Sequence, residues 1–168
     1  MNFRDLTAED IEVRVQSAKK NGVILLLYKN ARVDMNILDE TVGAENWQRE
    51  HYECKGNLFC RVGIRHMDGW VWKSDCGTES NTEAQKGEAS DSFKRACFNW
   101  GIGRELYTSP FLWVNKEDCG IVETEKNGRK VYACYDNFIV EKIKIENKKI
   151  VGLAIINQST GKRCLVWH

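Results

Sequence analysis

Proline and long apolar segments are nearly absent from this sequence. Only one of the 168 residues is proline, which excludes long Pro-rich linkers. The aliphatic run at residues 23–27 is far shorter than the roughly 18 residues that a transmembrane helix needs. The first residues, 1–5, are not followed by the apolar region of a secretory signal peptide. We therefore expect neither a membrane-spanning nor a secreted protein.

Metal-binding and redox patterns are also missing. The seven cysteines form no CxxC pair, and only three histidines are present, so the sequence does not support a zinc site. An odd number of cysteines argues against a complete disulfide framework. We expect reduced, mostly buried thiols in a protein of the cytoplasm, where thiols are kept reduced.

Motifs of the common enzyme classes do not occur. The sequence contains no GK[ST] phosphate loop, no GxSxG and no HExxH. Its one GxG, Gly101-Ile102-Gly103, lies where a helix is expected to end, so it cannot place a phosphate at a helix N-terminus. We therefore predict a protein that is not an enzyme and that uses no cofactor.

The length and the residue patterns predict an α+β fold. Residues 47–54, 58–66 and 69–76 are three segments separated by turn sequences, which indicates an antiparallel β-meander. We expect this meander to pack on a long amphipathic helix, in a β-β-β-α core within a domain of residues 1–113. Residues 114–168 are expected to form a basic, β-rich extension with strands at 121–124, 130–135, 138–145, 150–156 and 163–167. Other expected elements are helices at 7–20 and 34–41 and a strand at 23–28.

The long helix is expected to begin at a capping box, Ser80-Asn81-Thr82-Glu83, and to end at Gly101 or Gly103. Lys94 and Arg95 fall roughly 100–150° from the centre of its apolar stripe, so we expect them to face solvent or a ligand. The stripe consists of Ala89, Phe93, Ala96, Cys97 and Trp100.

Positive charge is concentrated in two places. In the middle strand of the meander, period two puts Arg61 and Arg65 on one face, which is either a ligand surface or simply exposed to solvent. Trp70 and Trp72 share a strand face that belongs to the core or to a subunit interface. Residues 126–168 carry nine Lys and Arg against three Asp and Glu, whereas residues 1–125 carry sixteen against twenty-one. A basic region of this kind favours a polyanionic partner or forms the solvated face of a hairpin.

Several of these segments recur in a fixed order in a known group of proteins. The order runs from Ala31-Arg32-Val33 through Asn46-Trp47 and Asp75-Cys76-Gly77 to the helix at 86–96 and Trp100-Gly101-Ile102-Gly103. Over residues 28–113 the chain resembles the Rad-fifty-two superfamily of single-strand annealing proteins, and within it the Sak type of phages and prophages.

The resemblance implies subunits assembled into a ring-like homo-oligomer, with single-stranded DNA held in a groove around the outside. It implies ATP-independent binding and annealing of complementary strands in recombination and repair, in the cytoplasm of a bacterial host. A phage exonuclease or a host single-strand-binding protein is a further expected partner. The residues expected to contact DNA are Arg32, Lys86, Lys94 and Arg95 from the resemblance, and Arg61 and Arg65 from strand alternation.

Two other functions stay open at this point. Carboxylates at Asp75, Glu79 and Asp91 would be the candidates for magnesium ligands in a metal-dependent nuclease. Alternatively, the basic hairpins after residue 113 would dock on a protein of phage replication or recombination.

Overall fold

The computed structural model describes residues 1–78 and 84–168, and contacts within the chain divide it into two compact units. We call residues 1–5 with 30–104 the core unit, and residues 6–29 with 105–168 the sheet unit. The expected capping box at 80–83 and Glu79 lie outside the described residues. The domain boundary expected after residue 113 stays a prediction.

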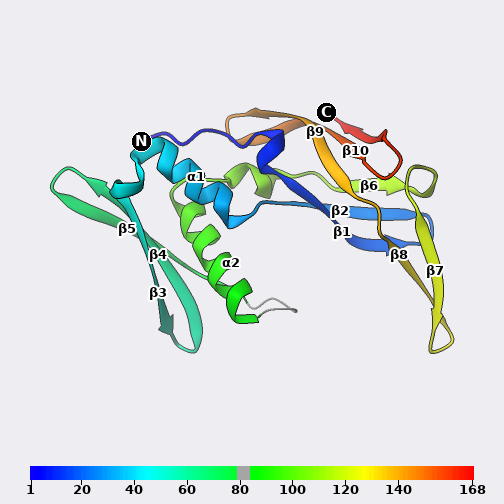
Figure 1. The fold of residues 1–168 in the computed structure, drawn as a ribbon, viewed down its shortest axis with the longest axis horizontal. Coiled ribbons are helices and arrows are strands. Elements are labelled where there is room, and N and C mark those ends of the chain that lie inside the picture. The colour runs from blue at the N-terminus through cyan, green and yellow to red at the C-terminus, as the bar shows by residue number, and fades with distance from the viewer. Residues whose placement is uncertain (79–83) are drawn as a thin grey trace. The chain divides into compact units, whose positions relative to one another are not determined.

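The core unit confirms the expected β-meander packed on a helix (Figure 1). Strands β3 (Trp47–Cys54), β4 (Asn57–His66) and β5 (Gly69–Cys76) form an antiparallel sheet, and α2 (Ala84–Asn99) packs against β4 and β5. Helix α1 (Ala31–Val42) contacts α2 and leads into β3. No described helix combines the length and hydropathy that crossing a bilayer requires.

The interior of the core unit follows from two periodicities. In β4, alternate residues Cys60, Val62 and Ile64 are fully buried, because period two turns them all to the face that α2 covers. Helix α2 contributes Phe93, Ala96 and Cys97, the centre of the expected apolar stripe, to the same interior. The two ends of that stripe, Ala89 and Trp100, are only half-buried, and the Trp100 indole N–H donates to the Val62 carbonyl over 3.0 Å.

Gly77 ends the meander at a point where only glycine fits. Its N–H donates to the Leu58 carbonyl (2.9 Å), and a Cβ built on it would lie 2.3 Å from the backbone carbonyl oxygen of Glu88 in α2. The Glu88 carboxylate in turn accepts from the N–H of Leu58 (3.0 Å). The glycine of the Asp75-Cys76-Gly77 motif therefore allows α2 to approach the sheet closely.

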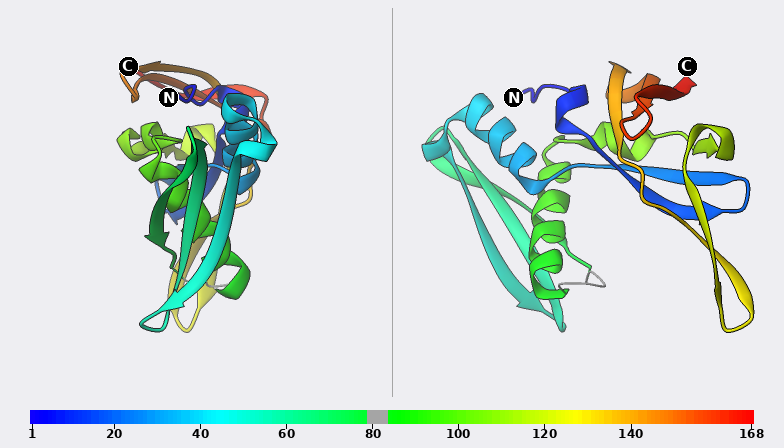
Figure 2. Two further views of the ribbon diagram at one scale, coloured as in Figure 1. Left: turned by 90° about the vertical axis from the view of Figure 1, so that its left-hand side faces the viewer. Right: turned by 45° about the vertical axis from the view of Figure 1, so that its right-hand side comes forward.

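The sheet unit joins the two ends of the chain in one six-stranded sheet. The hairpin β1–β2 lies between C-terminal strands, and β7–β8 forms a separate two-stranded sheet, drawn in yellow in Figure 2. The C-terminal strands are confirmed within about two residues of their expected bounds. The sheet order is β11 (Lys162–Trp167), β10 (Lys149–Asn157), β9 (Phe138–Glu146), β1 (Glu12–Lys19), β2 (Gly22–Tyr28) and β6 (Leu112–Asn115), and the separate strands are β7 (Ile121–Lys126) and β8 (Arg129–Cys134).

The helix expected at residues 7–20 is wrong. Thr7 does begin a capped turn, since its backbone N–H and hydroxyl both donate to the Asp10 carboxylate, but the turn is a single 3-10 turn, Ala8–Asp10. Strand β1 follows instead, with Val13 opposite Leu27 and Val15 opposite Leu25. The alternating β-branched residues and the partner strand β2 outweigh the local cap signal.

The cysteines are less buried than expected. Cys60 and Cys97 are buried, Cys54 is exposed, and the other four are half-buried. Burial raises the pKa of the Cys60 thiol to about 11.

Candidate nucleic-acid interface

Arg61 and Arg65 lie on the outer face of the meander, which we define as the face opposite α2. The Arg61 Nε donates to the Glu50 carboxylate (2.8 Å), and the Arg61 guanidinium lies 4.3 Å from the centre of the Trp72 ring. Glu50 is the residue opposite Arg61 on β3, so the ion pair follows directly from the strand register. The Arg61 side chain stays 41% exposed, which leaves part of its planar group open to solvent.

A row of flat groups continues along this face. The Arg65 guanidinium lies 5.4 Å from the centre of the Trp70 ring, and the Trp70 and Trp72 rings are 6.2 Å apart. Gly63 lies between the two arginines on β4, and a Cβ there would come within 2.8 Å of the Trp72 ring. The missing side chain at residue 63 therefore lets Trp72 lie across the strand. Both tryptophans are half-buried on the outer face and are not part of the interior.

Arg95 is held in an ion pair on α2. Its Nε lies 2.9 Å from an Asp91 carboxylate oxygen, which also accepts from the N–H (2.9 Å) and the hydroxyl (3.1 Å) of Thr78. Burial acts to raise the pKa of Asp91, but the hydrogen bonds from Thr78 and Arg95 outweigh it and lower this pKa below its ordinary value. Asp91 thus stays ionised and ties α2 to the end of β5. The Arg95 side chain is 39% exposed, so this ion pair still leaves part of its guanidinium group open to solvent.

The other three expected residues lie on the two helices. Lys94 is half-buried and Lys86 is exposed on α2. Arg32 is exposed near the start of α1, where the Asn30 side chain caps the helix by accepting from the Arg32 N–H (3.0 Å). The cap fixes the first turn of α1 and thereby the position from which the Arg32 side chain projects.

Three basic residues that the sequence reasoning missed also surround α2. Lys73 donates to the Asn99 carbonyl (3.2 Å) and Arg104 to the Phe98 carbonyl (2.8 Å), so both satisfy carbonyls at the end of the helix. Arg49 lies 4.7 Å from the centre of the Phe93 ring, on the helix-covered side of β3. A basic residue just beyond the end of a helix, as Arg104 is, was a usable signal for such a cap.

Five of the six expected residues therefore lie on two sides of one sheet, and the sixth, Arg32, is on α1. Arg61 and Arg65 lie on the outer face, whereas Lys86, Lys94 and Arg95 belong to the helix that covers the opposite face. Cationic and flat aromatic groups can hold phosphates and stack against planar bases. These groups suit binding rather than acid–base chemistry.

Two of the carboxylates suggested for a nuclease, Asp75 and Asp91, are described, and both already accept hydrogen bonds. Asp91 is engaged by Thr78 and Arg95, and an Asp75 oxygen accepts from the next N–H, that of Cys76 (2.7 Å). Glu79 lies outside the described residues. Within residues 1–78 and 84–168, no three His, Cys, Asp or Glu side chains are placed to share a metal ion.

Comparison with known proteins identifies related sequences. A family model described as Rad52/22 family double-strand break repair protein matches residues 3–120. The chain is also 32% identical over 104 residues to the single-stranded DNA-binding protein DdrA of Deinococcus radiodurans. That alignment covers 61% of this chain and 50% of the relative, so the chain spans about half the length of the curated relative that it matches. No solved structure matches the chain.

Proposed function

The chain belongs to the Rad52/22 family of double-strand break repair proteins, and from this membership we propose that it binds single-stranded DNA and anneals complementary strands without ATP. Proteins of this family are generally DNA-binding proteins and not enzymes. The observation that carries the proposal is the family match over residues 3–120, a range that includes all six expected contact residues. The name of the similar Deinococcus protein supports the choice of single-stranded DNA as ligand.

The basic residues on the helices supply the sequence-independent part of this binding. Arg32 and Lys86 are exposed and Lys94 is half-buried, and we assign all three to contacts with phosphates. Neutralising phosphates releases counterions and gives affinity that does not depend on sequence. Arg95 has two parts in this proposal: it holds α2 and the end of β5 together through Asp91, and its side chain, which is 39% exposed, contacts a phosphate beside Lys94.

The outer face of the meander supplies a second kind of contact. The guanidinium groups of Arg61 and Arg65 lie over Trp72 and Trp70, so each pair presents a flat, cationic surface. Stacking of an unpaired base on such a group is worth about 1–3 kcal/mol and tolerates any sequence. A strand held by its phosphates and by stacking keeps its hydrogen-bonding edges available, which is what pairing with a second strand requires.

The finer assignment belongs to the same proposal. We place the protein among the Sak-type annealing proteins of phages and prophages, acting in the cytoplasm of the bacterial host with a phage exonuclease or a host single-strand-binding protein as partner. A ring of subunits would link many weak contacts into tight binding, because each further contact forms at high effective concentration.

The binding test compares two pairs of adjacent cations. Lys94→Ala with Arg95→Ala is expected to raise the Kd for a labelled oligothymidylate about ten-fold at low salt and to reduce the log–log salt slope by about 1.4. Lys19→Ala with Lys20→Ala removes the same charge from an exposed pair outside the expected contacts and is expected to leave the Kd unchanged. Fluorescence anisotropy measures both, and circular dichroism shows that each variant is folded.

Equal affinities of the two double variants would contradict the proposed contacts. Annealing is measured separately, by energy transfer between two labelled complementary strands without nucleotide, and it is expected to be faster with protein than without. Shortened strands after incubation with magnesium would support a nuclease instead. Light scattering with and without DNA tests the ring.

A further inference from the structure

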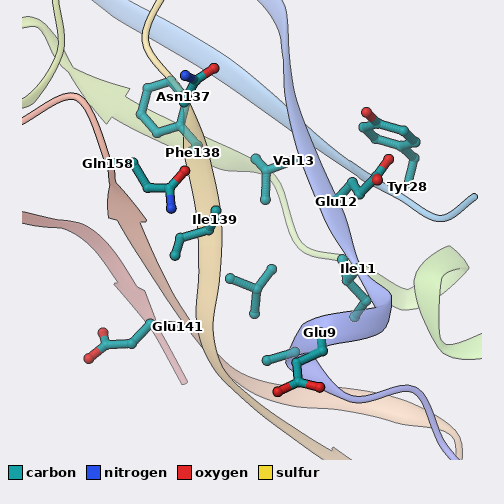
Figure 3. A pocket seen from close by; sticks show the side chains of 12 residues that line it. Glu9, Ile11, Glu12, Val13, Tyr28, Asn137, Phe138, Ile139, Glu141 and Gln158 are labelled. Carbon is teal, nitrogen blue, oxygen red and sulfur yellow. The ribbon is translucent and has the colours of Figure 1, made fainter. Parts of the chain in front are cut away.

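The six-stranded sheet of the sheet unit is interrupted between β1 and β9. These neighbouring strands share one residue pair, Glu12 with Ile139, whereas β9 pairs with β10 along nearly its whole length. An open cavity of about 590 Å³ lies at this interruption. Figure 3 shows its lining side chains, which come from the 3-10 turn Ala8–Asp10, from the start of β1, from Tyr28 of β2, from β9 and from Gln158.

The centre of this groove is apolar. Ile11, Val13 and Ile139 occupy the middle of the close-up in Figure 3. Ile11 is 5% exposed, whereas Ile139 is 38% exposed and so offers apolar surface to a ligand. A ligand covering Ile139 would remove that apolar surface from water, which favours binding.

The rim of the groove is acidic. Glu9 and Glu12 are exposed, and Glu141 is held by Arg163 through two contacts of 2.6 and 2.7 Å. Burial, and then a hydrogen bond to Glu12, raise the pKa of Tyr28, so the phenol stays protonated beside that carboxylate. With Glu141 neutralised, the rim carries Glu9 and Glu12. The nearby cation set against them is Arg14, whose guanidinium lies 5.5 Å from the centre of the Tyr28 ring. A DNA phosphate would be repelled here, and a cation would be attracted.

The interruption also leaves strand edges next to the groove. Among the described strands, no ladder joins β1 to β9 beyond the single pair. An extended peptide can align its backbone with such an edge, and its side chains then point alternately to either side. A peptide whose side chains alternate between apolar and cationic could therefore place one kind at the apolar centre of the groove and the other kind at its acidic rim.

We propose that this groove binds an extended segment of a partner protein in which Lys or Arg alternates with an aliphatic residue. The aliphatic side chains cover Val13 and Ile139, and the cations meet Glu9 and Glu12. The acidic rim repels phosphates, so the site takes a protein segment and not the nucleic acid. The inference does not rest on the proposed function.

A synthetic peptide of three Lys-Val repeats, labelled with a fluorophore, tests this site on the full chain without DNA. Glu9→Lys with Glu12→Lys is expected to raise the Kd of this peptide about ten-fold, because two attractions become repulsions. Ile139→Ser, which leaves the charge unchanged, is expected to raise it about three-fold. A matched control, Glu117→Lys with Glu125→Lys, reverses two exposed acids of the same unit outside the groove and is expected to leave the Kd within about two-fold.

Three results would overturn the proposal. One is an equal rise in the Kd of the Lys-Val peptide in the groove variant and in the matched control, which would mean that the peptide is attracted by the net charge of the protein alone. Another is equal affinity for a peptide of Glu-Val repeats. A third is a groove variant that lowers the mass of the assembled protein without changing peptide affinity, because the occupant would then be a second copy of this chain. Glu9→Lys alone, which leaves the Tyr28–Glu12 contact intact, keeps the test valid where the double variant does not fold.

Discussion

Among single residues, the basic side chains of the core unit differ in what they contact. Arg61 and Arg65 lie over indole rings, Arg95 pairs with Asp91, and Lys73 and Arg104 bind carbonyls at the end of α2. A basic side chain that already has a partner must give up that contact in order to bind a phosphate. Removing Arg95 therefore changes both the fold and the ligand surface, which is why the binding test needs a folded-state control.

Gly77 is expected to be intolerant of any side chain. A Cβ at this residue would meet the Glu88 carbonyl oxygen at 2.3 Å, so Gly77→Ala forces α2 away from the sheet. We expect a loss of about 1–3 kcal/mol in the free energy of unfolding, measured by urea denaturation. Gly69→Ala is the control, since nothing lies within 4 Å of a Cβ there. Equal stability of the two variants would show that α2 shifts at little cost.

Asp91 is expected to make stability depend on pH. Its pKa in the folded protein lies below the ordinary 3.8, so its contribution is fully present above that value and is lost as the pH falls through the folded pKa. Asp91→Asn should cost about 1–2 kcal/mol at neutral pH, with the difference from wild type shrinking below about pH 4. Denaturation at several pH values measures this, and Asp68→Asn in an exposed turn should show no such difference. A constant gap down to pH 2 would contradict the assignment.

At the level of elements, the β7–β8 hairpin is the least supported part of the sheet unit. It forms a sheet of two strands (Figure 2). Two of its valines are largely exposed, Val122 to 44% and Val131 to 42%. Two-stranded hairpins are marginal in water because they bury little apolar surface.

Hydrogen exchange should therefore be unequal within the sheet unit. We expect the amides of β7 and β8 to exchange at least about ten-fold faster than those of β10, whose Ile150, Leu153 and Ile155 are buried. Exchange followed by mass spectrometry of peptides measures both segments in one sample. Equal protection would indicate that a partner or a second copy covers the hairpin.

In the whole chain, residues far apart in sequence share one interior. Strands β1 and β2 come from the first 28 residues, yet they are enclosed by strands that begin after residue 111. Leu25 of β2 and Ile155 of β10 are both buried in this unit.

A core substitution near the C-terminus should therefore loosen the N-terminal hairpin. Ile155→Ala is expected to cost about 2–5 kcal/mol and to speed amide exchange in β1 and β2 more than in β4. Val62→Ala in the core unit is the counterpart and should act in the opposite order. Unchanged exchange in β1 and β2 would contradict a shared interior.

Much of the core unit was predictable from local patterns. Period two in β4 and the apolar stripe of α2 are properties of neighbouring residues, and they identified both the meander and its helix. The prediction of a helix at residues 7–20 was wrong because a local cap signal carries no information about the pairing of Val13 and Val15 with β2.

The site was predictable only in part. Strand alternation correctly put Arg61 and Arg65 on one face, but it said nothing of Trp72 lying across Gly63. Lys73 and Arg49 were missed because their contacts depend on where α2 packs. The DNA contacts themselves stay a prediction.

By itself, the sequence determined the β-β-β-α order, the faces of its strands and helix, and the family, because each depends on spacing along the chain. The tertiary structure alone decided which cations are already paired, where β1 lies and where the acidic groove opens. Those features depend on contacts between distant segments, such as Glu50 with Arg61 or β1 with β9. A local sequence pattern cannot predict the free energy of such contacts, because it does not contain both partners.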